Sequence, residues 1–495
     1  MNGCSINDEG IKILCEGIEN NLHLKDLILY GNKLGEEGMK ALCETLKKNN
    51  SVHKLDLSET EISETAMNHL SELLESNQSH LAELYLPESK IEKNSKSIFL
   101  KSVIKNTTLE KINLQAVEFD EEEQKIIAEI LKKNRTLKKI FLNQISEKSV
   151  LESLKTNTTL KKIALKLSEI EVSLLCEALI ENKSLESLNL SKGDFREKDL
   201  IEICKNLENN KSLKSLNFCE NKIKDNKNFS IICDSLKKNT TITSLNLSWM
   251  NLKELNAKYI SELLYQNTTL KKLNLNGNKL ADEGTKIVCQ SLFKNFSLHT
   301  LLLSYNYIRK EGLKEICCLL NQNFSLKFLD LNSNQNIFLD PEINFHFFDS
   351  IKNNKCIQFI DLSSTNLDID VINLIGDLIR FNSPSLKKID LSSNELDFDT
   401  LPLILRSLQH NFHLTKLGFS EFEDDFEINL IKKIDFLLNC NKSWKLNNHV
   451  YFFKKFKDAV FSFLLCMKEM QKSFNLKVPK FVLFEIIKKI DRRSF

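Results

Sequence analysis

Glycine, proline and long apolar runs are scarce in this sequence. Its 495 residues include 12 Gly and 5 Pro, which leaves little material for Gly-rich phosphate-binding loops, flexible linkers or collagen-like segments. No stretch approaches about 18 consecutive apolar residues, so we expect no membrane-spanning helix, and the polar N-terminus predicts no secretory signal. An excess of one charge is also missing. The 69 Lys and Arg against 67 Asp and Glu argue against a general nucleic-acid binder, which needs a basic surplus to contact phosphates.

Recognisable catalytic and metal-binding patterns are missing as well. The nine His residues are scattered, and His410 and His413 flank a predicted helix end. The 13 Cys residues include no C-x-x-C pair, whereas structural zinc needs four organised ligands. No G-x-x-x-x-G-K-[ST] phosphate loop occurs. The sequence therefore predicts no enzyme, no cofactor and no metal site.

A short phrase, L-x-x-L-x-L followed by N-x-L, recurs along most of the chain. One copy contains Leu24, Leu27, Leu29, Asn32 and Leu34. The first position of the copies falls at residues 24, 52, 81, 109, 137, 160, 185, 213, 242, 270, 298, 326, 357, 386 and 414. Most of these positions are 28 or 29 residues apart, as 24 and 52 are. So regular a spacing indicates a repeat protein.

Each repeat divides into a strand half and a helix half. The L-x-L core alternates apolar and polar residues, the period of a strand with one buried face. About ten residues later the period changes, and Met39, Leu42, Cys43 and Leu46 fall on one helical face. One strand and one helix cannot bury their own apolar faces, so the repeats must stack. We expect an α/β solenoid over residues 1–439, with about 15–16 units, a parallel sheet on the concave face and helices on the convex face.

Two columns of Asn punctuate the repeats. The first stands three residues before thirteen of the fifteen first positions, as Asn106 and Asn267 do, and we interpret it as a helix stop in the left-handed conformation. Many of these residues read N-x-S/T, for which we prefer the structural interpretation to glycosylation. The second column follows the strand, as Asn278 and Asn306 do, and we expect its side chains to bond turn backbone in neighbouring repeats.

Cysteine usage points to a reducing compartment. Seven cysteines share the apolar column of the predicted helices: Cys15, Cys43, Cys176, Cys204, Cys233, Cys289 and Cys317. The odd total and this column favour reduced core cysteines over a disulfide framework. We therefore expect a cytoplasmic protein, with the nucleus as the alternative.

The repeat resembles the leucine-rich repeat family, and its 28- to 29-residue period with a full helix resembles the ribonuclease-inhibitor-like subclass. That subclass includes ribonuclease inhibitor, the Ran GTPase-activating protein and the repeat arrays of nucleotide-binding immune receptors. The resemblance covers residues 1–440 and implies a non-enzymatic scaffold that binds an unidentified protein partner on its concave face. Two alternatives stay open: a Ran-type activator of a small GTPase, and a substrate receptor that recruits a ubiquitin-ligase adaptor.

The concave face is where such arrays usually display their functional residues, and its charges fall in three zones. Outward positions lie just before the second leucine, between the second and third, and just after the third. A basic zone contains Lys111, Lys139 and Lys162, joined by Lys138, Lys161 and Lys166; an uncharged zone contains Asn189, Asn217, Asn246 and Asn274; an acidic zone contains Asp330, Asp361 and Asp390. Either Asn and Asp are simply common at this repeat position, or the face is a polarised binding surface.

Aromatic residues add a second set of candidate partner-binding positions, because an exposed ring has no structural need to be there. A cluster of large apolar side chains is predicted on the same surface: Trp249, Leu302, Tyr305, Phe328 and Phe359. A smaller set lies nearer the N-terminus: Ile28, Tyr30, Tyr85 and Phe141. The alternative is that these rings pack along the turns between strand and helix.

Departures from the repeat mark three further regions. The units that begin at 137 and 160 are short, so their helices should lose about a turn. The unit that begins at 326 is long and carries an aromatic-rich insertion, residues 338–348, as a candidate docking loop. Residues 440–495 hold 13 Lys and Arg against 4 Asp and Glu, with nine of the 31 Phe. For this segment we expect a helical C-terminal cap, with an F-box- or SOCS-like adaptor or an anionic-lipid-binding element as alternatives.

Overall fold

The computed structural model describes residues 6–167, 172–193, 195–221, 223, 225–396, 400–420 and 425–444. The chain forms two compact units, Met1–Ile337 and Phe338–Phe495, and each is described by itself. In the described part of the chain, no helix is both long and apolar enough to cross a membrane.

The first unit is built on a parallel sheet of short strands, one from each repeat. Its strands are β1 (Asp26–Ile28), β2 (Lys54–Asp56), β4 (Glu83–Tyr85), β6 (Lys111–Asn113), β7 (Lys139–Ile145), β8 (Lys162–Leu167), β9 (Ser187–Asn189), β10 (Ser215–Asn217), β11 (Ser244–Asn246), β12 (Lys272–Asn274), β13 (Thr300–Leu302) and β14 (Phe328–Asp330). Each pairs with the next in chain order, and the middle leucines of neighbouring strands are register partners, as Leu27 and Leu55 are. A separate two-stranded sheet joins β3 (Glu61–Ile62) to β5 (Lys90–Ile91).

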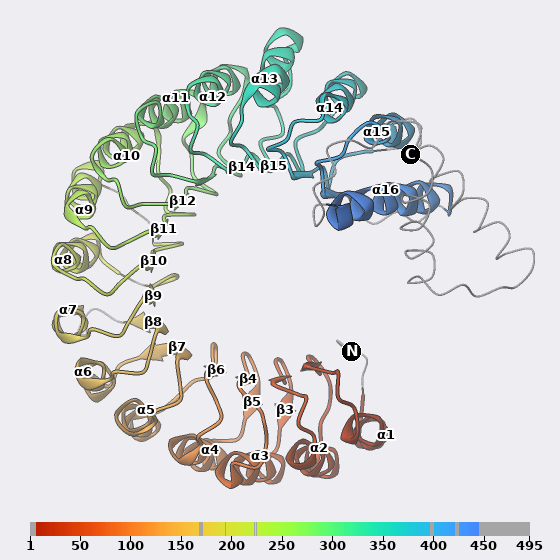
Figure 1. Ribbon diagram of the computed structural model, residues 1–495. Coiled ribbons are helices and arrows are strands. Elements are labelled where there is room, and N and C mark those ends of the chain that lie inside the picture. Colours follow the sequence, from red (N-terminus) through yellow and green to blue (C-terminus); the bar gives the residue numbers. More distant parts are fainter. Residues whose placement is uncertain are drawn as a thin grey trace, which may run out of the picture. The chain divides into compact units, whose positions relative to one another are not determined.

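One helix precedes β1, and one lies between each strand of the large sheet and the next, on the other side of the repeat. The helices are α1 (Asp8–Glu19), α2 (Glu36–Lys48), α3 (Glu64–Ser76), α4 (Lys93–Lys105), α5 (Glu121–Lys133), α6 (Lys148–Thr156), α7 (Val172–Glu181), α8 (Glu197–Leu207), α9 (Asn226–Lys238), α10 (Glu254–Gln266), α11 (Ala281–Leu292) and α12 (Lys310–Gln322). Within this unit the strands line the inner side of a curved array and the helices form its outer side (Figure 1). The predicted α/β leucine-rich-repeat solenoid is confirmed.

The second unit continues the same alternation. Its elements are α13 (Pro341–Asn353), β15 (Phe359–Asp361), α14 (Ile369–Phe381), β16 (Lys388–Asp390), α15 (Thr400–Leu408), β17 (Lys416–Gly418) and α16 (Asp425–Trp444). The three strands are parallel and in register. The boundary between the units falls within the long repeat that carries the aromatic insertion. The prediction of a docking loop at residues 338–348 is wrong, because residues 341–348 form the first part of helix α13. The domain division predicted at 439/440 stays a prediction, because residues 445–495 lie outside the described residues.

The core lies between strands and helices, as the two periods predict. Leu55 on β2 and Leu57, which directly follows the strand, are fully buried, and so are Met39 and Leu42 on α2. Burying one such side chain contributes about 1.5–3 kcal/mol. Because each repeat covers the apolar face of the next, this contribution exists only in the stack.

The cysteine column is part of this core. All seven predicted positions are buried, and burial raises the pKa of the Cys43 and Cys176 thiols to about 12. Thiols with so high a pKa stay protonated and are poor nucleophiles. The side chains therefore act as small apolar groups that fill the space between helix and sheet.

The first Asn column ends the helices as predicted, but by a different mechanism. Asn49 and Asn134, which follow α2 and α5, have φ of −79° and −69° with extended ψ, and not the left-handed conformation. Left-handed caps occur instead at Asn77 and Asn382, which lie outside the column. The column residues bridge repeats with their side chains. The Nδ2 of Asn182 donates to the carbonyls of Leu154 and Asn157 in the previous repeat.

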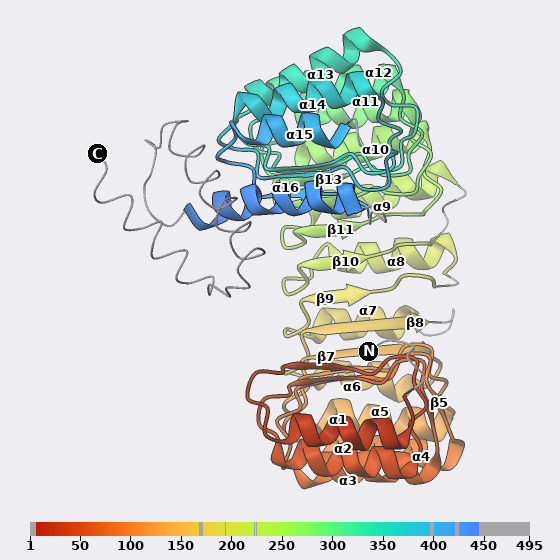
Figure 2. The same cartoon turned by 90° about the vertical axis from the view of Figure 1, so that its right-hand side faces the viewer.

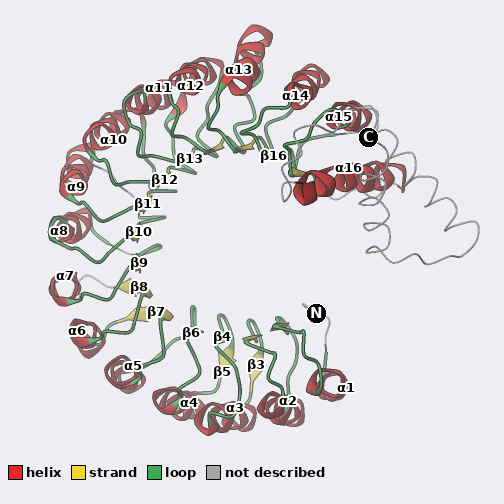
Figure 3. Ribbon diagram, viewed as in Figure 1, coloured by secondary structure: helices red, strands yellow, loops and turns green. Residues whose placement is uncertain are grey.

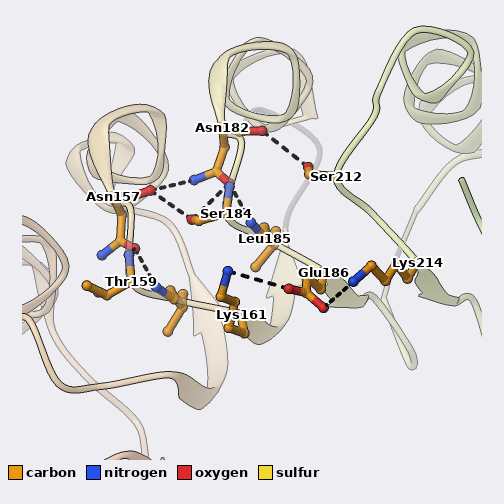
Figure 4. Close-up of polar contacts among 10 residues, drawn as sticks. Asn157, Thr159, Lys161, Asn182, Ser184, Leu185, Glu186, Ser212 and Lys214 are labelled. Carbon is orange, nitrogen blue, oxygen red and sulfur yellow. Dashed lines mark hydrogen bonds and ion pairs between the residues drawn. The ribbon is translucent and has the colours of Figure 1, made fainter.

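The same amide also shapes its own turn. The Oδ1 of Asn182 accepts from the backbone N–H of Ser184 at 2.9 Å and of Leu185 at 2.7 Å (Figure 4). Both side-chain atoms are therefore used, and the residue is buried. This supports the structural interpretation of the N-x-S/T motifs, since Asn106 and Asn267 are buried in the same way.

The second Asn column behaves as predicted. The Nδ2 of Asn278 donates to the Leu247 carbonyl of the previous repeat at 2.9 Å and to the Leu275 carbonyl of its own at 2.8 Å. Its Oδ1 accepts from the backbone N–H of Leu252 at 3.0 Å. Each such Asn therefore links the turn after its own strand to the equivalent turn in the previous repeat.

The two short repeats replace this Asn turn with longer strands. Strands β7 and β8 have 7 and 6 residues, where most others have 3, and they are the long strands in Figures 2 and 3. Helices α6 and α7 have 9 and 10 residues against 13 in α5, so the predicted loss of about one turn is confirmed. These two repeats therefore have fewer residues in the helix and more residues in the strand than the other repeats do.

Candidate interaction surface

The basic zone is assembled by strand register on the inner face of the first unit. Lys111 on β6 is the register partner of Lys139 on β7, and Lys139 is the partner of Lys162 on β8. Adjacent strands are about 4.8 Å apart. The structure therefore brings the three predicted lysines together on neighbouring strands.

Aromatic rings alternate with these lysines. The Tyr85 ring lies between the Nζ of Lys54, 4.7 Å from its centroid, and that of Lys111, 4.5 Å away. The Phe141 ring lies between Lys111 at 5.8 Å and Lys162 at 5.3 Å. Cation–π contacts at such distances hold ammonium groups over the ring faces. The zone is a basic–aromatic ladder, here defined as Lys54, Tyr85, Lys111, Phe141 and Lys162, with Lys139 beside it.

One carboxylate belongs to this ladder. The Glu83 side chain accepts a hydrogen bond from the Tyr85 hydroxyl at 2.8 Å and pairs with the Lys111 Nζ at 3.3 Å, and Lys111 also contacts the Tyr85 hydroxyl. Burial alone would raise the pKa of Glu83, but the Tyr85 hydroxyl and Lys111 together lower it below its usual value. Burial and the bond to Glu83 raise the pKa of Tyr85 to about 12. The Glu83–Lys111 pair thus neutralises the middle lysine of the ladder.

The C-terminal end of the ladder carries two lysines, Lys139 and Lys162, without a carboxylate at ion-pair distance within the described ranges. Partial burial lowers the pKa of Lys162, and the charges of Lys111 and Lys139 lower it further. This lowered pKa means that the site disfavours its own cations in the absence of an anion.

The lysines of the neighbouring row have carboxylate partners, which makes the row an internal comparison. Lys138 pairs with Glu110 at 2.5 Å, and Lys161 pairs with Glu186 at 3.4 Å. Glu186 also pairs with Lys214 at 2.9 Å, so it bridges two lysines from successive repeats (Figure 4). Of the predicted basic residues, Lys138 and Lys161 thus have carboxylate partners, while Lys139 and Lys162 do not.

The uncharged zone has a structural reason. Asn189, Asn217 and Asn246 are register partners on consecutive strands. The Oδ1 of Asn189 accepts from the backbone N–H of Ser191 at 3.0 Å, and Asn217 and Asn246 make the same bond two residues on, as does Asn274. An Asn or Asp at this position therefore caps the turn that follows its own strand.

The predicted acidic zone uses the same bond. In the second unit, Asp361 and Asp390 accept from the backbone N–H groups of Ser363 and Ser392 at 3.0 and 3.1 Å. Burial raises the pKa of Asp361, which the bonds from Ser363 oppose and the nearby Asp390 reinforces. These turn bonds favour the simpler of the two interpretations, that carboxylates stand here because the repeat needs an acceptor.

Asp330, in the first unit, is 7 % exposed and not an open surface charge. Its Oδ2 accepts from the Asn276 Nδ2 at 3.2 Å and from the Ser304 hydroxyl at 3.1 Å. Its Oδ1 accepts from the backbone N–H of Asn332 at 2.9 Å. The carboxylate thus ties three successive repeats together.

The predicted aromatic cluster is only partly assembled. Trp249 and Tyr305 are half exposed, and their ring centroids are 5.7 Å apart. Leu302 is 8 % exposed, because its strand lies between β12 and β14 and its side chain sits between their register partners, so it offers no open anchor. Phe328 is half-buried at the start of β14. Phe359 belongs to the second unit, where Lys388 lies 6.0 Å from its ring centroid.

A glycine makes the Trp249–Tyr305 contact possible. Trp249, Gly277 and Tyr305 occupy the same turn position in three successive repeats, and all have positive φ, 59°, 65° and 53°. A Cβ on Gly277 would overlap the Trp249 ring. The ring therefore lies across the glycine and reaches Tyr305 two repeats on. We call these two rings the aromatic rim patch, and exposed Tyr307 follows it in sequence.

Several of these residues escaped prediction from the sequence. Lys54 and Glu83 occupy the same outward column as Lys111, and their place in that column is the signal that could have found them. Gly277 could have been found from the alignment of repeats, since glycine replaces larger residues at this turn position. Tyr307 carries no such signal.

Comparison with known proteins gives one family that covers most of the array. A family model described as the MHP1/HER1/GIP3 LRR domain matches residues 140–421, which is more than half of the chain. A second model, described as Leucine Rich repeat, matches residues 20–43. No curated protein matches the chain.

Comparison with solved structures finds partial matches from several organisms. The leucine-rich repeat-containing protein LegL7 from Legionella pneumophila is 18% identical, with a TM-score of 0.43 over 60% of this chain and 98% of its own. The complex of Rad7 and Elc1 in yeast is 16% identical, with a TM-score of 0.43 over 83% and 87%. The tropomodulin C-terminal domain of Caenorhabditis elegans is 16% identical, with a TM-score of 0.27 over 32% and 93%.

Proposed function

The chain belongs to the MHP1/HER1/GIP3 LRR domain family, and on that premise we propose that it is a non-enzymatic interaction scaffold whose first unit binds an acidic segment of a protein partner on its inner face. The observation that carries this proposal is the pair Lys139 and Lys162. They are register partners without a carboxylate within ion-pair distance among the described residues.

The chemistry of the ladder suits an extended acidic segment. Carboxylates of a partner would relieve the repulsion that lowers the pKa of Lys162. Phe141 beside these lysines offers apolar area to the partner, and desolvation around it strengthens each charge pair. Charge complementarity of this kind sets specificity and association rate more than it sets raw affinity.

Reversing the two unpaired charges tests the proposal. We expect the Lys139→Glu/Lys162→Glu double variant to capture about tenfold less of its partner proteins, because two attractive contacts become repulsive. The measurement is affinity capture from extract of the native cell with quantitative mass spectrometry, at about 0.05 M and 0.2 M salt.

The matched control is Lys138→Glu/Lys161→Glu, which changes net charge equally but acts on lysines that already have carboxylate partners. It should retain most of the captured proteins. If both double variants lose the same proteins to the same extent, the effect is one of net charge and the inner-face site is wrong.

The aromatic rim patch is proposed as a second part of this interface, since exposed Trp and Tyr are frequent hot spots. We expect Trp249→Ala with Tyr305→Ala to weaken partner binding by about tenfold while the melting temperature stays nearly unchanged, because both rings are half exposed. Calorimetry of the variant alongside the capture experiment checks both parts. A large drop in melting temperature would instead assign the rings to packing.

The finer assignments belong to the proposal too. The full helix of 13 residues in most repeats supports the ribonuclease-inhibitor-like subclass. The buried, protonated cysteine column supports a reducing compartment, the cytoplasm or the nucleus. Single-turnover GTP hydrolysis by small GTPases, with and without the protein, tests the Ran-type alternative; stimulation of about a hundredfold would replace the scaffold with an activator. The adaptor alternative falls on residues 445–495, outside the described residues.

A further inference from the structure

A hollow of about 400 Å³ opens between α13 and α14 of the second unit. Its apolar wall includes Phe338 from the insertion, Phe345 on α13, and Val371 and Leu374 on α14. Phe338 is itself anchored, because its ring packs against Phe347 and Phe348 of the core at centroid distances of 5.7 and 5.8 Å. Phe338 is thus held against buried rings of α13 and forms a fixed part of the wall.

Apolar side chains at the hollow are also exposed. Leu339, Phe345 and Ile369 are 71%, 51% and 46% exposed. Leu339 and Phe345 line the hollow, and Ile369 lies between two of its lining residues in sequence. Exposed apolar side chains grouped around a concavity are typical of a binding surface, whereas scattered ones need no explanation.

Polar groups give the hollow a definite chemistry. Asn344 is 4% exposed and donates from Nδ2 to the Phe338 carbonyl at 3.1 Å, but its Oδ1 has no hydrogen-bond partner within the described ranges. Two carboxylates, Asp368 and Asp370, complete the lining, which contains no Lys or Arg. Asp368 uses one oxygen to cap α14 through the backbone N–H of Val371 at 2.8 Å.

We propose that this hollow is a docking site for a partner segment that presents one Leu-sized apolar side chain next to Lys or Arg. The volume of about 400 Å³ is above the lower limit of about 300 Å³ for ligand pockets, so it has room for one large apolar side chain and the backbone beside it. The two carboxylates would pair with the flanking cations, and an N–H of the segment would satisfy the Asn344 Oδ1. The site lies in the second unit and does not depend on the inner-face function proposed above.

Peptide binding tests the proposal directly on the full chain. The probe is a fluorescein-labelled nonapeptide, Gly-Ser-Lys-Lys-Leu-Lys-Lys-Ser-Gly, followed by fluorescence anisotropy. We expect saturable binding, about tenfold weaker binding when the central Leu is Ser, and loss of binding when the Lys residues are Glu. Equal binding of the Leu and Ser peptides would mean that only charge is recognised, and would overturn the proposal.

Two variants of the protein locate the site. Leu374→Trp fills the hollow from a half-buried position, and Asp370→Lys reverses a charge at its edge. Each should weaken binding of the Leu-containing peptide about tenfold, while circular dichroism shows an unchanged melting temperature. The control is Glu254→Lys, which reverses a first-turn acid of α10 in the other unit. Unchanged affinity for Leu374→Trp, or no saturable binding by the wild-type chain, would contradict a docking site here.

Discussion

Replacing Asn134 by Ala lowers the free energy of unfolding by about 3 kcal/mol, because the change strips partners from several buried backbone groups at once. The Nδ2 of Asn134 donates to the carbonyls of Val103 and Asn106, both at 2.9 Å. Its Oδ1 accepts from the backbone N–H groups of Thr136 and Leu137 at 2.9 and 2.8 Å. A truncated side chain leaves four groups without a partner in a site that is 3% exposed.

Urea unfolding followed by far-ultraviolet circular dichroism measures the loss, with amide hydrogen exchange to show whether it is local to α4 and α5. Asn353→Ala is the control, since this exposed side chain makes one bond, to the Asp349 carboxylate within its own helix, and should change stability by about 0.5 kcal/mol or less. Asn134→Asp keeps the acceptor but removes the donor. If it proved as stable as wild type, the bonds between repeats would contribute nothing.

Replacing Gly277 by Lys costs about 2 kcal/mol and displaces the Trp249 ring from Tyr305. The cost does not come from backbone conformation alone, because Lys192 occupies the same turn position in another repeat with φ of 58°. It comes from overlap between the new side chain and the Trp249 ring, which must move into solvent. The two effects can be separated because the chain has only 2 Trp residues.

In a Trp444→Phe background, Trp249 is the sole tryptophan, and its selectively excited emission should shift to longer wavelength in the Gly277→Lys variant. A double-mutant cycle completes the experiment. In a Trp249→Ala background, Gly277→Lys should cost only the left-handed backbone penalty of about 1 kcal/mol. An equal loss with and without the ring would show that backbone strain, and not the aromatic rim patch, requires glycine.

The repeat architecture could be predicted from the sequence because its determinants are local. The alternation at Leu27 and Leu29 and the helical spacing of Met39, Leu42 and Cys43 each lie within one repeat, and the buried faces follow directly from them. The second Asn column was predictable for the same reason, since its bonds link turns that the period already brings side by side.

The conformation of the first Asn column was not predictable, because a helix can end in either a left-handed or an extended residue. What selects the extended form at Asn49 is its pair of bonds to the Ile18 and Asn21 carbonyls of the previous repeat. Those bonds appear only when repeats are stacked. Single-repeat reasoning therefore identifies the helix stop and misses its geometry.

The candidate site was predictable by position but not by environment. The outward columns identified Lys139 and Lys138 alike, yet only Lys138 has a carboxylate partner, contributed by the previous repeat. Likewise, the position of Asp330 gave no sign that Asn276, two repeats away, would bury and bond it. The burial of a side chain and its ion pairs and hydrogen bonds depend on several repeats at once, whereas the sequence pattern describes a single repeat.

The reach of the first Asn column has a consequence for synthesis of the protein. Asn182 contacts carbonyls 28 and 25 positions earlier in the chain, and Asn239 one that is 32 earlier. A nascent chain leaving the ribosome therefore needs no distant C-terminal sequence to satisfy these bonds. At about 5–20 residues per second, the next module emerges within a few seconds and can add to those already folded. The coil can thus grow in the order in which it is translated, with only its leading edge left open to solvent or chaperones.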